Sequence, residues 1–370
     1  MEISFNNGQR KKGNSFLAAL LMLVIGTGLL WWNEYNNVQN IKVLAAFEKE
    51  AVEISSETVD SQYDGKAVTT NGKLTVVDDP LQDDELPIEV KTARLKRVVE
   101  MYQWEEKEET DDGRTTYSYR KTWSDKMLDT PHDSQKNTEN HRYAMPYRTD
   151  EFLAKDVKVG AYNLSADQIS NIAIDAELDF PTEALIAGYN KQGKFMTNST
   201  NLESPNIGDV RIIWKYNDWT EASVAARLSG NSFKDYTSEN SANSINRVDK
   251  GLLSKAELCK NQKDENNMIK WILRGLGALL ILCGYLALIS FITRFTNKIP
   301  ILGSIVGWAL SAIAFLVAVI HALLVIIIAW FRYRPVLAII LLVVIVVAVV
   351  GIVILLKKKK NAQAPPANVQ

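Results

Sequence analysis

The histidines are the side chains in this sequence best suited to acid–base or metal chemistry near neutral pH. Three occur, and two of them, His132 in TPHDS and His141 in ENHRY, lie in polar sequence beside Asp133 and Glu139. Imidazole and carboxylate groups together can hold a metal ion. However, their spacing fits no metal site on a regular element, and HExxH, GxSxG, Walker and GxGxxG motifs are absent. The sequence therefore predicts solvated loop histidines, with no catalytic residue, no cofactor and no metal site.

Acidic residues and cysteines add little to this chemistry. Acidic residues occur in adjacent pairs at Asp78-Asp79, Asp83-Asp84 and Asp111-Asp112. We interpret these pairs as turn residues or solvated charges rather than as acid–base pairs. Cys259 lies in polar sequence and Cys283 in an apolar run, so no disulfide is expected, and no CxxC motif occurs. The formal net charge of −1 argues against a nucleic-acid partner, which would require a basic face.

The third histidine, His321, lies within a long apolar segment. An ionisable residue in a membrane span is a candidate for a proton relay or a pore lining. The alternative is a neutral histidine hydrogen-bonded to a neighbouring helix, which we favour because the surrounding sequence contains no acidic residue. In the same segment Gly303, Gly307 and Ser311 are four residues apart and share one helical face. Small residues at this spacing predict close helix packing, either within a bundle or between protomers.

Four apolar segments are long enough to cross a bilayer. The first, 16–32, follows three basic residues and ends in Trp31-Trp32 without a small-residue cleavage pattern, which favours a retained anchor over a cleaved signal peptide. The second is broken only by Lys270 and Arg274, and Arg274 can extend to the interface. The third and fourth are separated by FRYRP, where Pro335 predicts a turn.

The basic residues that flank these segments predict the orientation of the chain. If the chain has four spans, most of the flanking basic residues lie on one side of the membrane: 10–12, Arg294, Lys298 and 357–360. The positive-inside rule identifies this side as the cytoplasm. The predicted order is a cytoplasmic N-terminus at 1–15, a span at 16–32, an extracytoplasmic or lumenal domain at 33–267, spans at 268–293, 299–331 and 335–356, and a cytoplasmic tail at 357–370. The lipid bilayer is therefore an expected partner.

The clearest element of the 33–267 domain is a hairpin over 98–123. A two-residue turn at Asp112-Gly113 would pair Glu109 with Thr116 and Glu105 with Arg120. The aromatic residues that this register places on one face are Tyr102, Trp104, Tyr117, Tyr119 and Trp123. We expect them to form a core, because cross-strand aromatic pairs stabilise a sheet, and an aromatic ligand platform is the alternative. The opposite face, which includes Gln103, is expected to meet water.

Other segments of the domain complete an α+β, strand-rich class. Segments 208–218 and 221–233 are predicted to be a second strand pair with its turn near Asn217-Asp218. Helices are expected over 36–55 and 250–267, directly beside the first two spans. The first of these is amphipathic, so it is predicted to lie on the bilayer surface or to pack on the sheet.

Several segments together resemble the transmembrane protein 43 family, also called LUMA. The matching segments are LKRVVEMYQW at 95–104, YSYRKTW at 117–123, GDVRI at 208–212 and YRP at 333–335, and the order of one span, a large domain and three spans also agrees. The likeness covers most of the chain, but it is weak between Asp125 and Asn206, and the loop after Trp123 departs from the family's pattern.

This resemblance implies a non-enzymatic integral membrane scaffold that self-associates and organises complexes of other membrane proteins. In animals it implies the endoplasmic reticulum and the inner nuclear membrane. Related proteins occur in bacteria, and the short N-terminus and the plain KKKK tail fit a bacterial member in an inner membrane, where a nuclear-envelope role does not apply. A channel or transport component that uses the last three spans is the alternative function.

Overall fold

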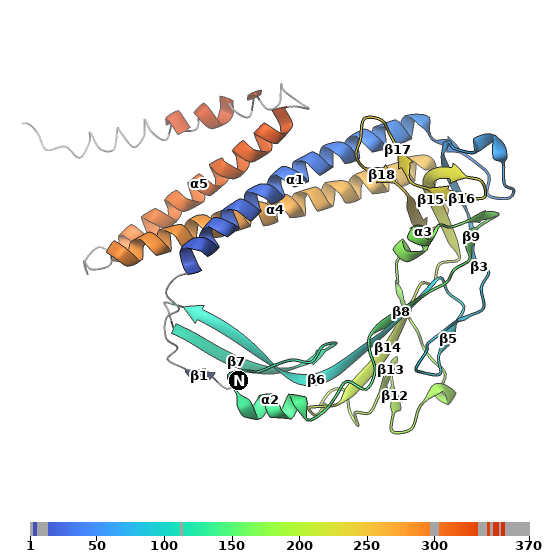
Figure 1. Cartoon of the computed structure of the whole chain (residues 1–370), viewed down its shortest axis with the longest axis horizontal. Coiled ribbons are helices and arrows are strands. Elements are labelled where there is room, and N and C mark those ends of the chain that lie inside the picture. The colour runs from blue at the N-terminus through green and yellow to red at the C-terminus, as the bar shows by residue number, and fades with distance from the viewer. Residues whose placement is uncertain are drawn as a thin grey trace, which may run out of the picture. The chain divides into compact units, whose positions relative to one another are not determined.

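The computed structural model describes residues 3–5, 14–111, 114–296, 303–331, 339–340, 343–347 and 349–351 (Figure 1). The chain divides into two compact units. The sheet unit comprises Met1–Arg10, Ala45–Thr237 and Ser244–Lys260, and the helix unit comprises Lys11–Leu44, Ser238–Asn243 and Asn261–Gln370.

Three long helices dominate the helix unit: α1 (Asn14–Glu50), α4 (Lys255–Thr296) and α5 (Gly303–Phe331). Of the helices described, three are long and apolar enough to cross a membrane, at Phe16–Glu50, Lys255–Phe291 and Leu310–Phe331. The chain is therefore mixed in class, with membrane helices at both ends of a strand-rich middle. The predicted fourth span at 335–356 lies largely outside the described residues, of which 339–340, 343–347 and 349–351 are helical.

The two separate helices predicted beside the first two spans are continuous with those spans, which corrects that prediction. The sequence from Trp32 to Glu50 contains neither glycine nor proline, so nothing stops the helix at the end of its apolar part. With 37 residues, α1 is about 55 Å long against a hydrocarbon core of about 30 Å. The polar half of α1 therefore extends past the hydrocarbon and forms no separate surface helix.

Glycines allow α1 and α4 to pack closely in the helix unit. A Cβ atom added at Gly277 would lie 2.7 Å from the side chain of Leu30, and one added at Gly26 would lie 2.9 Å from the carbonyl oxygen of Gly277. A Cβ at Gly284 would lie 2.8 Å from the side chain of Leu23. Small residues allow such contacts where lipid supplies no hydrophobic drive between helices. The core beside them consists of Leu30, Ile281, Ala318, Ala322 and Val325.

Replacing Gly277 with alanine is expected to lower the stability of the helix unit by about 1–3 kcal/mol, because the added methyl group overpacks this contact. Gly275→Ala on the same helix is the matched control, since a Cβ added at Gly275 would meet no atom within 4 Å and alanine is the better helix former. Thermal unfolding of the two purified variants in mild detergent makes the comparison. Equal midpoints for the two variants would show that the helices are not in tight contact at Gly277.

The sheet unit contains two larger sheets among its described residues. The first runs in the order β1-β7-β6-β14-β13-β12, with β11 beside β14 and β8 beside β6, and the second runs β19-β15-β16-β10-β9-β3-β2, with β15 also beside β3. Strands of the first sheet are β1 (Ile3–Phe5), β6 (Arg94–Asp111), β7 (Arg114–Ser124), β8 (Asp150–Leu153), β11 (Ala176–Glu177), β12 (Asn190–Gln192), β13 (Phe195–Thr197) and β14 (Val210–Tyr216).

The second sheet and two short strand pairs complete the unit. The second sheet comprises β2 (Val52–Glu53), β3 (Ala67–Val76), β9 (Val157–Val159), β10 (Tyr162–Asn163), β15 (Glu221–Ser229), β16 (Ser232–Lys234) and β19 (Arg247–Lys250). The pairs are β4 (Leu81–Gln82) with β5 (Glu89–Val90), and β17 (Tyr236–Thr237) with β18 (Ser244–Ile245). Two short helices are α2 (Ser134–His141) and α3 (Ala166–Asn171), the latter begun by a Ser165 capping box.

The predicted pairing of 208–218 with 221–233 is wrong, because the two strands belong to different sheets. Strand β14 pairs with β6, β11 and β13, whereas β15 pairs with β3, β16 and β19. Asn217 lies between these two strands, where the chain passes from the first sheet to the second, and it is buried. Its backbone N–H donates to Arg94 O at 3.2 Å, and its side-chain oxygen accepts from the backbone N–H of Ala93 at 3.2 Å. Two separate hydrophobic cores result, one on each sheet.

Candidate functional site

The β6–β7 hairpin has the register that the sequence predicts. Glu109 lies opposite Thr116, Glu105 opposite Arg120, and Asp111 opposite Arg114. The predicted turn residues, 112 and 113, lie outside the described residues. This register places the five aromatic residues of the hairpin on one face, because side chains alternate along a strand.

Helix α2 contacts this aromatic face. Trp104 Nε1 donates to Glu139 at 2.7 Å, and the Lys136 ammonium lies 5.2 Å from the Trp104 ring and 4.7 Å from the Tyr119 ring. Asn140, fully buried, accepts from the Trp104 backbone N–H and donates to the Trp104 carbonyl oxygen, both at 2.8 Å. Tyr117 and Tyr119 are buried, while Tyr102, Trp104 and Trp123 are half-buried. The face is thus largely occupied by the protein itself.

Part of the opposite face is also covered, which corrects the expectation that it meets water. Gln103 is fully buried, and its side chain donates to Lys126 O at 2.8 Å and accepts from the Leu128 backbone N–H at 2.9 Å. Only the far part of this face, around Arg120, is exposed. The segment after Trp123 therefore folds back over the hairpin on its way to α2.

The two polar histidines lie at opposite ends of α2 and have separate partners. His132 Nδ1 lies 2.7 Å from Glu106 and its ring stacks on Tyr117, while His141 Nε2 lies 2.7 Å from Asp129. His141 is the last residue of α2, so the prediction of a loop position holds for His132 alone. Asp133 caps the helix, and its ion pair with Lys136 lowers the pKa of its carboxyl group.

Potential metal ligands are dispersed in the described part of the chain. There, no group of three or more histidine, cysteine, aspartate or glutamate side chains is placed to hold a metal ion. The two free cysteines also differ in their surroundings, since Cys259 is buried in the sheet unit and Cys283 is half-buried in α4.

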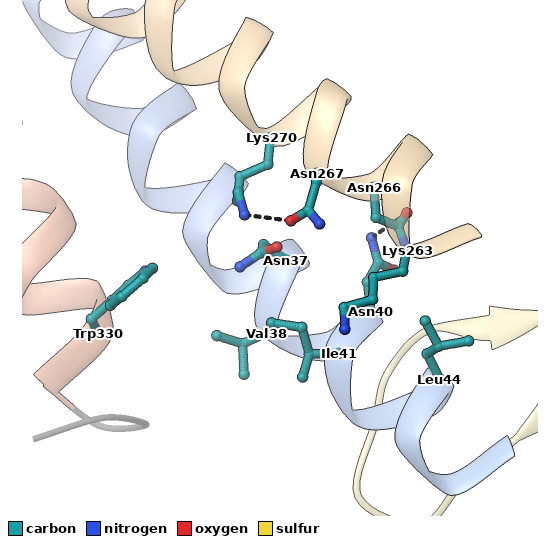
Figure 2. A pocket seen from close by; sticks show the side chains of 10 residues that line it. All are labelled: Asn37, Val38, Asn40, Ile41, Leu44, Lys263, Asn266, Asn267, Lys270 and Trp330. Atoms are coloured by element: carbon teal, nitrogen blue, oxygen red, sulfur yellow. Dashed lines mark hydrogen bonds between the residues drawn. The ribbon is translucent and has the colours of Figure 1, made fainter. Parts of the chain in front are cut away.

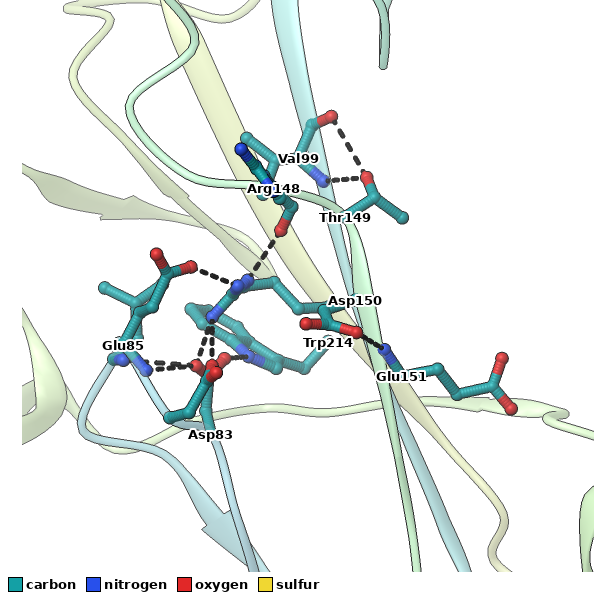
Figure 3. Close-up of polar contacts among 11 residues, drawn as sticks. Asp83, Glu85, Val99, Arg148, Thr149, Asp150, Glu151 and Trp214 are labelled. Atoms are coloured by element: carbon teal, nitrogen blue, oxygen red, sulfur yellow. Dashed lines mark hydrogen bonds and ion pairs between the residues drawn. The ribbon is translucent and has the colours of Figure 1, made fainter.

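Asp83, the first residue of the Asp83-Asp84 pair, lies in the core, which corrects its interpretation as a solvated charge (Figure 3). Asp84 is 64% exposed, as expected of a solvated acidic residue. The side chains of Asp83 and Arg97 form an ion pair and are 0% and 1% exposed. Asp83 also accepts from Trp214 Nε1 at 2.7 Å and from the backbone N–H of Glu85 at 3.0 Å. Arg97 further donates to the carbonyl oxygen of Arg148 at 2.8 Å and to the Glu85 carboxylate. Every charge of the pair is thus hydrogen-bonded, as burial requires.

A second buried ion pair lies in the helix unit, just after Trp31-Trp32. Glu34 is 0% exposed, and Arg274 donates to both of its carboxylate oxygens, at 2.5 and 2.9 Å. Trp330 Nε1 also donates to Glu34, so α1, α4 and α5 meet at this carboxylate. Arg274 does not extend alone to the interface: its guanidinium lies 4.7 Å from the Trp271 ring and 5.3 Å from the Trp330 ring.

The indole side chains beside this pair indicate a membrane boundary. Trp31, Trp32 and Trp271 are each half or more exposed, and they flank the Glu34–Arg274 contact in sequence or in space. Tryptophan is enriched where hydrocarbon meets headgroups, because its ring is apolar and its N–H is polar. The apolar parts of the helices therefore end at this level.

His321 is hydrogen-bonded on both ring nitrogens. Its Nε2 lies 3.2 Å from the Thr27 hydroxyl and its Nδ1 lies 3.1 Å from the Tyr285 hydroxyl. Thr27 donates its own proton to Leu23 O at 2.6 Å, so it can only accept from His321. A neutral ring with its proton on Nε2 satisfies every group, with Tyr285 donating to Nδ1. The network bridges α1, α4 and α5 and ends at a backbone carbonyl.

The small residues predicted to pack all lie in α5. Gly303, Gly307 and Ser311 are helical, and Ser311 is exposed, while the side-chain surroundings of the two glycines lie outside what is described. The same helical face continues through Ala314, Ala318 and Ala322, which are buried. Because Ala318 and Ala322 pack against Leu30 and Ile281, this later part of the face points into its own bundle, whereas Ser311 does not.

Sequence reasoning missed the buried ions and the packing glycines. Nothing in the sequence around Glu34 marks it as buried, and Asp83 has the local sequence of a solvated turn. A usable signal was the presence of one arginine, Arg274, inside an otherwise apolar segment, because such a charge needs a partner of opposite sign. For the glycines, the signal was the seven-residue spacing of Gly277 and Gly284 on one helical face.

Comparison with known proteins shows the family of this chain. Residues 101–335 match the family model of transmembrane protein 43, which is more than half of the chain. Transmembrane protein 43 of Rattus norvegicus is 26% identical over 345 residues, covering 86% of this chain and 84% of that protein. The Drosophila melanogaster homolog is 24% identical over 337 residues, covering 87% and 89%, and the Homo sapiens protein is 24% identical over 347 residues, covering 86% and 84%. No solved structure matches. The chain belongs to the transmembrane protein 43 family.

Proposed function

We propose that this protein is a non-enzymatic membrane scaffold that self-associates and binds other membrane proteins through its sheet unit. The observation that carries the proposal is the pairing of α1 with α4, which precede and follow the strand-rich region in the chain. The strand-rich region is connected to the bilayer by α1 on one side and α4 on the other. Glycine contacts and the buried Glu34–Arg274 pair hold these two helices together. Such a double attachment suits a domain that presents a surface beside a membrane.

In this proposal both termini lie in the cytoplasm and residues 33–267 lie on the other side of the membrane, with four spans in all. The basic residues that flank the apolar segments support this orientation. The membrane would be the endoplasmic reticulum and inner nuclear membrane in a eukaryotic cell, and the inner membrane in a bacterium. In this proposal the aromatic residues of the β6–β7 hairpin have a structural role, which is to pack against α2.

His321 and the small-residue stripe are assigned structural roles in the bundle. The two hydrogen bonds of His321 support a bridge between helices rather than a relay, so we do not propose a channel. Gly303 and Gly307 lie on the same side of α5 as the buried Ala318 and Ala322, so we propose that these two glycines pack within the protomer, whereas Ser311 is exposed. Self-association would then use a different surface.

Self-association is expected to give one defined oligomer of the full chain, both in mild detergent and in nanodiscs. Size-exclusion chromatography with light scattering, and single-molecule mass measurement over a wide concentration range, would detect it. Gly307→Leu is expected to lower the midpoint of thermal unfolding before it changes the oligomer, because the stripe packs inside the bundle. A monomer at every concentration tested would remove self-association from the proposal.

Partner binding can be tested by proximity labelling in the native host with the labelling enzyme at two positions. One fusion inserts it between Gly193 and Lys194, which are exposed in the tight turn between β12 and β13, and the control fusion carries it after Gln370. The proposal predicts a set of membrane proteins labelled from the first position and not from the second. Identical sets from both positions would contradict a partner-binding role for the sheet unit.

A further inference from the structure

A groove of about 280 Å³ opens in the helix unit (Figure 2). It lies near the buried ion pair, because Trp330 lines it and also donates to Glu34. Its walls come from the polar half of α1, the facing part of α4 and the end of α5. The lining residues are Asn37, Val38, Asn40, Ile41, Leu44, Lys263, Asn266, Asn267, Lys270 and Trp330. None of these residues is acidic, two are lysines and four are asparagines.

Asn37 is the unusual member of the lining. Its residue is only 6% exposed, yet its side chain has no hydrogen-bond partner among the described residues. The Asn37 amide atoms are not sealed in the core, because they open onto the groove, where water or a ligand can reach them. The Asn37 amide lines the groove, and a molecule in the groove would supply its missing partner.

The other polar groups of the groove leave donors over rather than acceptors. The side-chain oxygen of Asn266 accepts from Asn40 Nδ2 at 3.3 Å, and that of Asn267 accepts from the Lys270 ammonium at 2.6 Å. The side-chain oxygen of Asn40 accepts from Asn243 at 2.5 Å. The side-chain oxygens of these three asparagines are therefore already hydrogen-bonded, and the polar groups that they leave for a ligand are N–H groups. A ligand that matches this lining is an anion with several acceptor oxygens.

The opposite side of the groove is apolar and lies next to the membrane boundary. Val38, Ile41 and Leu44 line it from α1, and Trp330 lines it while also donating to Glu34. Asn37 follows Glu34 by three residues, which is about 5 Å along a helix. The headgroup layer beyond the hydrocarbon is about 5–8 Å deep in each leaflet. The start of the groove thus lies at headgroup depth if the tryptophans mark the end of the hydrocarbon.

We propose that this groove binds an anionic glycerophospholipid. The phosphate would accept hydrogen bonds from the Asn37 amide and the Lys270 ammonium, with Lys263 adding charge, while the start of an acyl chain lies against Val38 and Ile41. The site goes beyond the proposed scaffold function and does not depend on oligomers or on protein partners. It depends only on the membrane placement of α1, α4 and α5.

The test uses the full chain, delipidated in mild detergent, with one of three added probes (phosphatidylglycerol, phosphatidylcholine or inorganic phosphate) or with no addition. Native mass spectrometry counts bound lipid, and thermal unfolding reports stabilisation. Phosphatidylglycerol is expected to bind most tightly. Lys263→Gln and Lys270→Gln should each weaken that binding about fivefold, because one basic residue near an anionic surface is worth about that factor. Lys260→Gln, an exposed lysine on the same helix outside the groove, should have no effect.

Asn37→Leu separates a ligand site from a packing defect. Without lipid this variant is expected to be as stable as the natural chain or more so, because it removes an unpaired amide; with phosphatidylglycerol it should lose most of the stabilisation. Three results would overturn the proposal: phosphatidylcholine as effective as phosphatidylglycerol, inorganic phosphate giving the same protection, or all groove variants binding like the Lys260 control. The second of these would assign the groove to a free anion instead.

Discussion

Arg274→Met is expected to destabilise the helix unit by about 3–5 kcal/mol, since it leaves Glu34 charged and fully buried with only the Trp330 N–H as a partner. Thermal unfolding of the full chain in mild detergent should show a markedly lower midpoint. The stability is lost because the Glu34 carboxylate stays buried without its counter-charge. The ion pair as a whole stabilises the fold little compared with apolar side chains of the same size.

The double variant Glu34→Gln/Arg274→Met distinguishes this cause from lost packing. It removes the stranded charge, so it should recover most of the stability that Arg274→Met loses. Lys260→Met, which removes an exposed cation from the same helix, should change the free energy of unfolding by less than about 0.5 kcal/mol. An Arg274→Met chain as stable as the Lys260→Met control would mean that the Glu34–Arg274 pair is not buried.

The second large effect is expected in the sheet unit, at Arg97. Arg97→Met leaves the Asp83 carboxylate, which is 0% exposed, with only Trp214 and two backbone N–H groups as donors. We expect a loss of about 3–5 kcal/mol. Hydrogen exchange measured by mass spectrometry on the full chain should show faster exchange in β6 and β14, which Arg97 and Trp214 occupy.

Arg120→Met is the matched control for Arg97→Met, because Arg120 lies on the same hairpin and its side chain is 70% exposed. Its ion pair with Glu105 is solvated, so its loss should change stability little. Adding Asp83→Asn to Arg97→Met should restore part of the protection, since a neutral amide tolerates burial better than a carboxylate. Equal exchange rates for the Arg97 and Arg120 variants would contradict the buried network.

The sequence predicted those parts of the fold that depend on local pattern. The apolar segments predicted membrane helices because their length matches the hydrocarbon thickness, and the hairpin register followed from alternation and a two-residue turn. In each case the determining residues lie within a few positions of one another.

What could not be predicted depends on contacts between distant residues. Asp83 has the local sequence of an acidic turn, and only its pairing with Arg97 and Trp214 makes it a core residue. Asn217 looks like a hairpin turn, yet its contacts with Ala93 and Arg94 send the chain to the other sheet. Glu34 looks like a solvated residue at the end of a span until Arg274, 240 positions later, is placed beside it.

The central claim, that two spanning helices carry a domain on the side of the membrane opposite the termini, is tested most directly by cysteine accessibility. In a chain with Cys259→Ser and Cys283→Ser, a single cysteine is introduced by Lys194→Cys in the exposed β12–β13 turn, or by Ala362→Cys in the tail. In sealed vesicles whose outer face is the extracytoplasmic or lumenal one, a membrane-impermeant maleimide should label the Lys194→Cys chain at once and the Ala362→Cys chain only after lysis. Labelling of the tail in sealed vesicles, with the turn protected, would contradict the account.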